Sequence, residues 1–478
     1  MSRILNVLID RVLVVIANYG MKNRSYLDRI IWEYQSMNKY DVDIVVLSDV
    51  PKNIGSEIEV LVGLPADDPW SLPYGYKKIF NERKDEYALY IYSEDDTLIT
   101  ESNIDAFVEE TSNLPEEYIA GFIRHEIDVS GKRYISTMHS HYHWDARSVK
   151  RFGGSIFAYY TNEHSACFIL NNAQLHHALH TKRFMLPPRC GKYDMLVTAA
   201  TEPYTECGMK KIVCISRIED FCLHHLPNVY YGKMGLDEST ALHEISKLAS
   251  YVDLHYDILP NPLIDPEPLD NIVGYNKKYY ESMRNDVIDV IPNNVRMVLS
   301  VGCGCGSTEA ALIDKGMIVF GIPMDEIISI TAEKKGVIML PSNLQLAYDI
   351  INYIKFDCII YMDILHHLTN PVSALRIFTQ LLHEDGISVI SMPNWDDCSS
   401  VKKRILTKLK GYTCPGSVLT KPTQQSCINY ITNLIREESM ARGSMISKHS
   451  KSYDIKYNKT FAYVRHLHLR HVVMVAKN

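Results

Sequence analysis

The chain has 478 residues, 46% of them hydrophobic and 22% charged, and its formal net charge is -7. This length exceeds one ordinary core and predicts two or three domains, and the composition excludes a chain dominated by disorder. A general nucleic-acid binder needs a basic face to neutralise phosphates, so the acidic balance predicts no nucleic-acid partner.

The eleven cysteines follow no regular spacing. Cys303 and Cys305 stand in a glycine-rich turn, where a disulfide between them is geometrically implausible, so we expect free thiols and a reducing, cytoplasmic compartment. The apolar stretch 4–17 is interrupted by Asp10 and Arg11, which argues against a signal peptide or a spanning helix. No other run approaches the length of a membrane span, so no transmembrane segment is expected.

Strand-like and helix-like patterns alternate along the first part of the chain. The predicted strands and helices cover, in order, residues 12–17, 24–37, 43–47, 74–83 and 88–92. Such alternation is typical of a parallel sheet covered on both faces. Beyond about residue 118, shorter strand-like pieces separated by turns predict an antiparallel extension of the same domain.

Three acidic residues, Glu94, Asp95 and Asp96, directly follow the last of these strands. Ligands of open α/β sheets bind at the carboxyl ends of strands, and three carboxylates there would repel a nucleotide diphosphate unless a hard divalent cation lay between them. In an extended segment Glu94 and Asp96 point to the same side. The alternative is an ordinary acidic loop, with Asp95 or Asp96 capping the segment that follows.

This region resembles the metal site of GT-A-fold glycosyltransferases through the sequences YIYSEDDTLIT and GFIRHE and the predicted helix between them. The resemblance covers roughly residues 10 to 235. It implies an α/β nucleotide-diphospho-sugar transferase fold, a Mn²⁺ or Mg²⁺ cofactor, a UDP- or GDP-sugar donor and a glycan acceptor. It makes Asp96 a metal ligand and lets Glu94 and Asp95 contact the metal or the donor ribose.

Further positions of that family map onto the ends of the first two strands. Asn18 and Tyr19 stand where such enzymes receive the nucleoside, and Asp49 stands where the base or ribose is touched. An inverting transferase also needs a carboxylate base for the acceptor hydroxyl, for which Glu126 is the candidate. A structural ion pair between Arg124 and Glu126 is the alternative.

Late in the same domain, GT-A enzymes often bring a histidine back to the metal, and His225 or His224 stands there, with Lys233 placed to meet the phosphates. Histidines on an ordinary strand or loop are the alternative. Three more histidines share one face if their segment is extended and suit zinc, although an acceptor-facing or exposed strand is favoured; they are His139, His141 and His143.

A Pro- and Asp-rich stretch between residues 258 and 271 breaks both helix and strand patterns. We therefore predict a GT-A glycosyltransferase domain over 1–255, a linker over 256–271 and a second domain over 272–478. The second domain starts its own strand–helix alternation at Met297.

The strand from Met297 runs into a turn with glycines at alternate positions, Gly302, Gly304 and Gly306, and a helix is predicted over 307–315. Glycines let a ligand approach the backbone closely, and a helix N-terminus offers free N–H groups. Several nucleotide-binding folds share this signal, but the GK[ST] ending of a phosphate-binding loop is absent.

The following segments FDCII, DILHHL, EDGIS and SMPN, in that order, resemble a Rossmann-like class I S-adenosylmethionine-dependent methyltransferase. The patterns predict a strand leading into a helix at 356–368, a turn at 384–386 and a strand at 387–391. By resemblance, the three glycines pass beneath the methionine part of S-adenosylmethionine, and Asp363 and His366 or His367 line the reaction pocket. His367 is the candidate base for an acceptor hydroxyl, and a histidine packed against the sheet is its alternative.

The sequence departs from that family where the cofactor nucleoside binds. Pro323 replaces the acidic residue that usually binds the ribose hydroxyls, and Asp325 stands two positions later as its substitute if the loop is reshaped. Ser300 and the stretch 341–343 also lack acids that are common there. A lost carboxylate removes a charge-assisted hydrogen bond, so weaker cofactor affinity is expected.

The leading hypothesis is a bifunctional enzyme of polysaccharide or glycan assembly that transfers a sugar and then O-methylates the glycan. In the second hypothesis the glycosyltransferase is active and the methyltransferase-like half is a non-catalytic docking module. In the third, the methyltransferase works and the first domain only binds a glycan.

Overall fold

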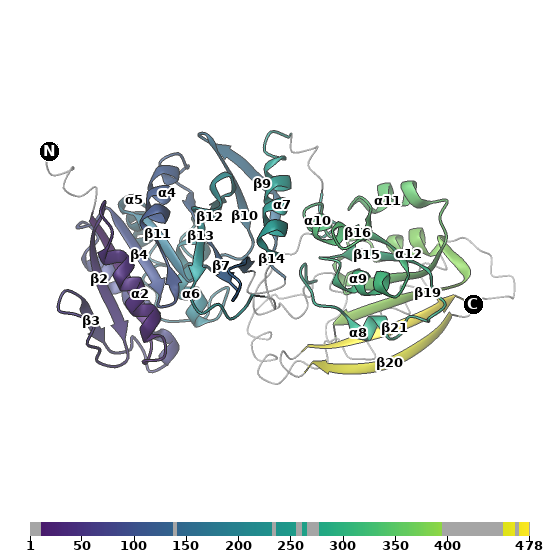
Figure 1. The fold of residues 1–478 in the computed structure, drawn as a ribbon, viewed down its shortest axis with the longest axis horizontal. Helices are drawn as coiled ribbons and strands as arrows, with labels where there is room; N and C mark the ends of the chain where they lie inside the picture. Colours follow the sequence, from purple (N-terminus) through teal and green to yellow (C-terminus); the bar gives the residue numbers. More distant parts are fainter. Residues whose placement is uncertain are drawn as a thin grey trace. The chain divides into compact units, whose positions relative to one another are not determined.

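The computed structural model describes seven stretches of the chain: 11–136, 141–231, 236–254, 261–264, 277–393, 453–463 and 468–477. The chain forms two compact units, residues 1–256 and 257–478, and each is described by itself. Figure 1 shows the sheet and covering helices of each unit.

The first unit is built on a five-stranded sheet in the order β11-β4-β1-β2-β3. Its strands are β1 Arg11–Asn18, β2 Asp41–Ser48, β3 Glu59–Val62, β4 Leu89–Glu94 and β11 Cys167–Asn171. The first four are mutually parallel, and β11 is antiparallel to β4. Because β1 lies at the centre of the sheet, its apolar residues are buried in an unbroken run, as in strands covered on both faces.

The three predicted strands of this sheet are confirmed as β1, β2 and β4. The helix predicted from residue 24 is α2 Arg24–Gln35, and the one predicted over 74–83 is split between η1 Pro69–Gly75 and α3 Tyr76–Glu82. Pro73 lies inside the 3-10 turn η1, which agrees with the poor fit of proline to an α-helix interior. Thr100 and Asn103 form a capping box that starts α4 Glu101–Thr111.

Two smaller sheets complete the first unit. The four-stranded sheet has the order β6-β12-β10-β9 and contains β6 Tyr118–Ala120, β12 Lys210–Cys214, β10 Ser155–Tyr160 and β9 Trp144–Phe152. The five-stranded sheet has the order β14-β8-β7-β13-β5 and contains β14 Leu236–Asp237, β8 Arg133–Ser136, β7 Ile123–Ile127, β13 Cys222–His225 and β5 Thr97–Leu98. The predicted antiparallel extension is partly wrong, because β6 pairs with β12 and β7 with β13 in parallel.

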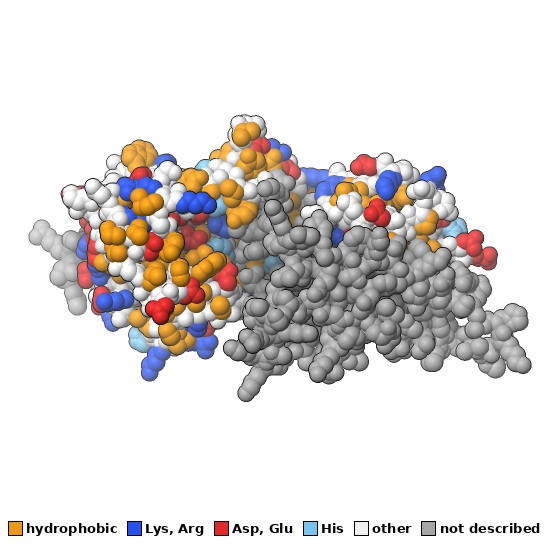
Figure 2. Space-filling view, turned by 90° about the horizontal axis from the view of Figure 1, so that it is seen from below, with side chains coloured by type: hydrophobic (Ala, Val, Ile, Leu, Met, Phe, Trp, Pro, Cys, Tyr) orange, Lys and Arg blue, Asp and Glu red, His pale blue; other side chains and the backbone are white. Residues whose placement is uncertain are grey.

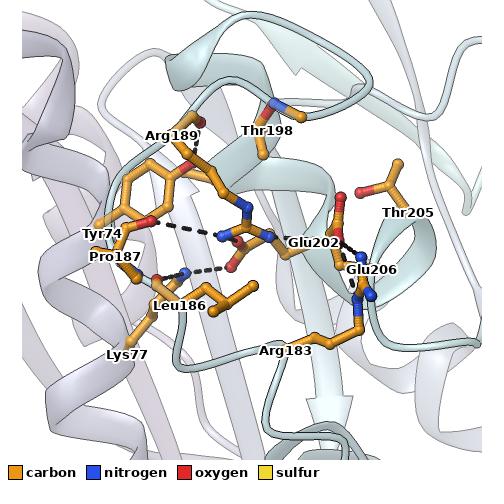
Figure 3. Close-up of polar contacts among 12 residues, drawn as sticks. Tyr74, Lys77, Arg183, Leu186, Pro187, Arg189, Thr198, Glu202, Thr205 and Glu206 are labelled. Atoms are coloured by element: carbon orange, nitrogen blue, oxygen red, sulfur yellow. Dashed lines mark hydrogen bonds and ion pairs between the residues drawn. The ribbon is translucent and has the colours of Figure 1, made fainter. Parts of the chain in front are cut away.

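A buried charged cluster fixes the connection between α5 Asn172–His180 and α6 Met195–Thr205 (Figure 3). Glu202 is fully buried and forms ion pairs with Lys77 and with Arg189. Lys77 also donates to the Leu186 carbonyl at 2.9 Å. These contacts tie the connection to α3, because a buried charge is tolerated only with such partners. The unit also contains η2 Ile215–Arg217 and α7 Glu238–Ala249.

The second unit is one seven-stranded sheet in the order β17-β16-β15-β18-β19-β21-β20. Its strands are β15 Met297–Cys303, β16 Ile318–Pro323, β17 Ile338–Met339, β18 Phe356–Met362, β19 Leu382–Pro393, β20 Tyr453–Tyr463 and β21 His468–Lys477. Its helices are α8 Asn285–Ile288, α9 Ser307–Asp314, α10 Ile328–Glu333, α11 Leu344–Ile351, η5 Leu365–His367 and α12 Pro371–Thr379. The strands from β17 to β19 are parallel, and β21 is antiparallel to β19.

Two expectations for this unit are corrected. The helix predicted after β18 is only the 3-10 turn η5, since Asn370-Pro371 begins a separate helix, α12, three residues later. The predicted turn at 384–386 lies within β19, whose pairing with β18 skips from Leu382 to Ile387. The strand bulges at the turn residues and then resumes.

The described residues form no membrane-spanning helix and no disulfide. In the part of the chain described, no helix is long and apolar enough to cross a membrane. The eight cysteines within that part are free thiols, and all but Cys190 are buried. On the face of the first unit drawn in Figure 2, acidic, basic and hydrophobic side chains are intermingled.

Candidate functional site

The carboxylates of the first unit gather at the carboxyl end of its parallel sheet. Glu94 is the last residue of β4, and Asp95 and Asp96 form the turn into the short strand β5. β5 pairs with β13 so that Thr97 lies opposite His225. This pairing of segments far apart in the sequence brings His225 to the carboxylates.

His225 lies between two carboxylates. Its Nε2 is 3.4 Å from Asp96 Oδ2, and its Nδ1 is 2.6 Å from Glu126 Oε1. Burial acts to lower the pKa of His225, but the hydrogen bonds to Asp96 and Glu126 outweigh it and raise that pKa. Because Glu126 accepts from Nδ1, the ring presents Nε2 toward Asp96.

Glu126, the predicted base, is fully buried, and both its oxygens are engaged. Besides the contact with His225, its Oε2 accepts the backbone N–H groups of Tyr230 and Tyr231 at 2.6 Å each. Burial acts to raise the pKa of Glu126, but these three hydrogen bonds prevail and hold it below its usual value. Such contacts favour a carboxylate that positions His225. The base assignment stays a prediction.

Glu94, which is partly exposed, and the buried Arg124 interact electrostatically at this site. Burial, followed by repulsion from Asp96, raises the pKa of Glu94 to about 8, and the positive charge of Arg124 opposes that rise. Among the described residues, Glu94 Oε1 and Arg124 Nη2 have no hydrogen-bond partner. Unsatisfied buried polar atoms cost free energy, and a bound ligand with hydroxyl or phosphate groups is one way to satisfy them.

Asp95 is held by two asparagines. Asn18, at the end of β1, and Asn23 both donate to its carboxylate, the latter at 2.8 Å. Burial raises the pKa of Asp95 to about 6, while these bonds act to lower it. Asn23 was missed from the sequence, because it follows the strand by five residues and carries no motif.

The end of β2 contributes the remaining polar groups. The Gly20 N–H donates to Asp49 Oδ1 at 2.7 Å, while the adjacent Tyr19 ring is 53% exposed and free to stack on a planar group. Lys52, also missed from the sequence, donates to the Asn18 carbonyl at 3.1 Å and to Ser48. It supplies a cation beside the carboxylates.

The predicted three-ligand metal site of Glu94, Asp96 and His225 is not assembled: no described group of three or more His, Cys, Asp or Glu side chains is arranged to hold a metal ion. Asp96 and His225 nevertheless face each other, and Glu94 Oε1 is unsatisfied. These residues fit an open site in which protein supplies two ligands and substrate phosphates supply others. His224 instead contacts Asn228.

Some predicted positions lie elsewhere. Lys233 and His139 fall outside the described residues. His141 and His143 are buried, so the expected exposed strand is wrong at these two positions, and the acceptor-facing alternative stays a prediction. The zinc alternative gains no support, because no three His, Cys, Asp or Glu side chains in the described part of the chain are arranged to hold a metal ion.

In the second unit, the glycine turn has the backbone that the sequence predicts. Gly302 and Gly306 have φ values of +80° and +74°, a region that side chains rarely adopt. A Cβ on Gly304 would lie 2.5 Å from the Tyr279 carbonyl oxygen, which also accepts the Cys305 N–H at 2.7 Å. The close approach to this turn is therefore made by the chain's own backbone.

The two candidates near the reaction pocket have internal partners. Asp363 has φ +50°, and its carboxylate accepts from Arg284 at 3.0 Å and from Ser391 at 2.9 Å. His367 Nε2 accepts the Lys277 N–H at 3.1 Å. This nitrogen is engaged, so His367 as a base requires Lys277 to move. Arg284 was not predicted from the sequence, because it lies upstream of every motif of the second unit.

At the expected ribose position, Pro323 ends β16 without a carboxylate. Asp325 Oδ1 accepts the N–H groups of Ile327 and Ile328, both at 2.8 Å, and burial raises the pKa of this carboxyl to about 6. Asp325 therefore caps the start of the next helical segment. In this arrangement Pro323 supplies no carboxylate to the ribose of S-adenosylmethionine, and the carboxylate of Asp325 is engaged in the cap.

The second unit is similar to known methyltransferases. Residues 299–390 match the family model described as a methyltransferase domain. The chain is 29% identical over 160 residues to the ubiquinone biosynthesis O-methyltransferase of Haemophilus ducreyi, a match that covers 32% of this chain and 64% of that protein. A protein of the same name from Glaesserella parasuis is 31% identical over 111 residues, covering 21% of this chain and 46% of the relative. This chain thus spans less than two thirds of either relative.

Two solved structures were also matched. Magnesium protoporphyrin IX methyltransferase from Synechocystis PCC 6803 has 15% identity and a TM-score of 0.30, covering 41% of this chain and 80% of that one. A possible histamine N-methyltransferase from Thermotoga maritima has 15% identity and a TM-score of 0.28, and the match covers 41% of this chain and 86% of that one.

From the family match, the second unit contains a class I methyltransferase domain. This is the class of methyltransferase that uses S-adenosylmethionine.

Proposed function

We propose that the chain is a bifunctional enzyme of glycan assembly. Its first unit would transfer a sugar from a UDP- or GDP-sugar, and its second would O-methylate the glycan. The observation that carries the first half is the pair Asp96–His225 at the carboxyl end of a parallel sheet, with His225 fixed by Glu126. Fusion raises the effective concentration of the intermediate for the second step.

For sugar transfer, the chain's residues take separate roles. Asp96 and His225 would hold the divalent cation, which when bound would neutralise the diphosphate charge. Asp95, oriented by its two asparagines, accepts from ribose hydroxyls, and the exposed ring of Tyr19 stacks on the base. Lys52 adds a positive charge for the phosphates. The acceptor hydroxyl oxygen would then bond to the anomeric carbon as the bond between that carbon and the diphosphate oxygen breaks, the nucleoside diphosphate leaves and the hydroxyl proton passes to solvent.

The first half is tested by hydrolysis of a panel of UDP- and GDP-sugars by the full chain with Mn²⁺. We expect Mn²⁺-dependent release of the nucleoside diphosphate, lost in Asp96→Asn and retained in the surface control Asp67→Asn. Hydrolysis that is unaffected by Asp96→Asn, or that occurs equally with a chelator, would contradict the assignment.

For methylation, S-adenosylmethionine supplies the methyl group, and the glycine turn of the second unit would hold its methionine part. The relatives named above are O-methyltransferases by name, which supports a hydroxyl acceptor. A non-catalytic docking domain is the second candidate, and Pro323 at the ribose position favours it. Transfer of a labelled methyl group to the glycosylated product would exclude the docking domain.

A further inference from the structure

Four residues from the predicted linker, 261–264, pack against the second unit's own sheet. The Leu263 N–H donates to the Met324 carbonyl at 2.7 Å, and the Asn261 carbonyl accepts the Ser342 hydroxyl at 2.8 Å. Ile264 is 5% exposed and belongs to the hydrophobic core. A freely solvated linker would make none of these contacts, so this segment is part of the second unit's fold.

The anchoring points mark one place at the edge of the sheet. Met324 directly follows β16, and Ser342 stands three residues beyond β17, the strand parallel to β16. Ligands of such sheets bind beyond the carboxyl ends of the strands. In the methyltransferase resemblance, the end of the second strand and the stretch 341–343 are the ribose- and adenine-contacting positions. The segment 261–264 therefore lies where that resemblance places the nucleoside end of the cofactor groove.

The groups a nucleoside would need there are already used. Pro323 offers no carboxylate, and Asp325 accepts two backbone N–H groups. The Met324 carbonyl and the Ser342 hydroxyl are hydrogen-bonded to residues 261–264 themselves. Ile264 belongs to the same apolar cluster as Met324, where a flat, mostly apolar adenine would otherwise pack.

We propose that residues 261–264 are an internal plug of this groove, which S-adenosylmethionine must displace to bind. The proposal rests on the cofactor proposed for the second unit. When only a fraction of molecules has an open groove, the apparent dissociation constant rises by the inverse of that fraction. Wild-type affinity is then set by how often the plug leaves, and weakening its anchors tightens binding.

The test is isothermal titration of the full chain with S-adenosylhomocysteine. Two variants weaken the plug: Ile264→Ser removes the apolar anchor, and Ser342→Ala removes the hydroxyl that holds the Asn261 carbonyl. Leu346→Ser, at a residue 51% exposed on α11, is the matched control. We expect at least tenfold tighter binding in Ile264→Ser, a smaller gain in Ser342→Ala and wild-type affinity in the control.

Equal affinity in all four proteins would overturn the plug and leave cofactor binding intact. If all four proteins are folded and none binds S-adenosylhomocysteine, both the plug and the proposed cofactor are ruled out. Hydrogen exchange in the wild type gives a readout that needs no variant. Saturating S-adenosylhomocysteine should speed exchange at the Leu263 amide, which loses its bond to Met324, and unchanged or slower exchange would also overturn the plug.

Discussion

The substitution Glu126→Gln separates a positioning role from a base role at the first site. Glu126 accepts three hydrogen bonds, from His225 Nδ1 and from two backbone N–H groups, all at 2.6 Å. A glutamine has one oxygen and one NH₂ group. The NH₂ group therefore faces either the two backbone N–H groups, donor against donor, or His225 Nδ1, which would have to give up its proton to accept. Hydrogen bonds to a charged acceptor contribute about 1.5–3 kcal/mol each, so the variant should lose roughly 1–3 kcal/mol of unfolding free energy.

The functional magnitude follows from the role of His225. Loss of a partner that orients a metal ligand typically costs about 10–100-fold in metal affinity. We therefore expect the Mn²⁺ concentration for half-maximal nucleotide-sugar hydrolysis to rise by about that factor. Loss of a general base would instead slow transfer by about 10²–10⁴-fold at saturating Mn²⁺, with an unchanged Mn²⁺ requirement.

The assay is a Mn²⁺ titration of hydrolysis and transfer by wild type, Glu126→Gln and the exposed control Glu116→Gln. A wild-type Mn²⁺ requirement in Glu126→Gln would refute the positioning argument. If transfer alone collapsed, the base role predicted from the sequence would be restored.

Three further predictions concern stability, each measured by urea unfolding. Glu202→Leu leaves Lys77 buried without its partner and should cost about 3–5 kcal/mol, most of it recovered by adding Lys77→Met; equal losses in the single and double variants would contradict this. Burial lowers the pKa of Lys211 to about 7, so the folded protein releases that proton before the unfolded chain does. The free energy of unfolding of Lys211→Met should therefore exceed that of wild type most below pH 7. This difference should shrink by up to ~1.4 kcal/mol per pH unit as the pH rises toward 10. A difference that stays constant with pH would disprove the burial argument. Gly304→Ala places a Cβ 2.5 Å from a backbone oxygen and should cost about 1–3 kcal/mol, whereas Gly154→Ala, with open space around it, should cost less.

Much of the central sheet of each unit followed from local patterns. The buried runs that became β1, β2, β4, β15 and β18 are continuous and apolar, so neighbouring residues alone identify them. Only part of β19 was predicted. Residues 387–391 were identified as a strand, but Glu384-Asp385-Gly386 carries the composition of a turn, and only the pairing of Leu382 with Phe356 places the residues before that turn in the same strand.

The sequence identified several residues of the first unit's site but not the contacts between them. His225 and Glu126 were both candidates, with unrelated roles, and their contact depends on the parallel pairing of β7 with β13 across about a hundred residues of sequence. Asn23 and Lys52 carry no motif and join the site only through the turns that follow β1 and β2. The prolines of 256–271 predicted a linker, but nothing local predicts that residues 261–264 dock on the second unit's sheet.

If the first unit binds a nucleoside diphosphate through a cation held by Asp96 and His225, binding of UDP or GDP must require that cation. Isothermal titration of UDP and GDP into the full chain, with Mn²⁺ and with a chelator, measures this requirement. We predict binding of one of the two only with Mn²⁺, weakened at least tenfold in Asp96→Asn and unchanged in Asp67→Asn. Absence of binding in both conditions, or binding that is indifferent to Mn²⁺ and to Asp96→Asn, would rule out a cation-dependent nucleotide site at Asp96 and His225.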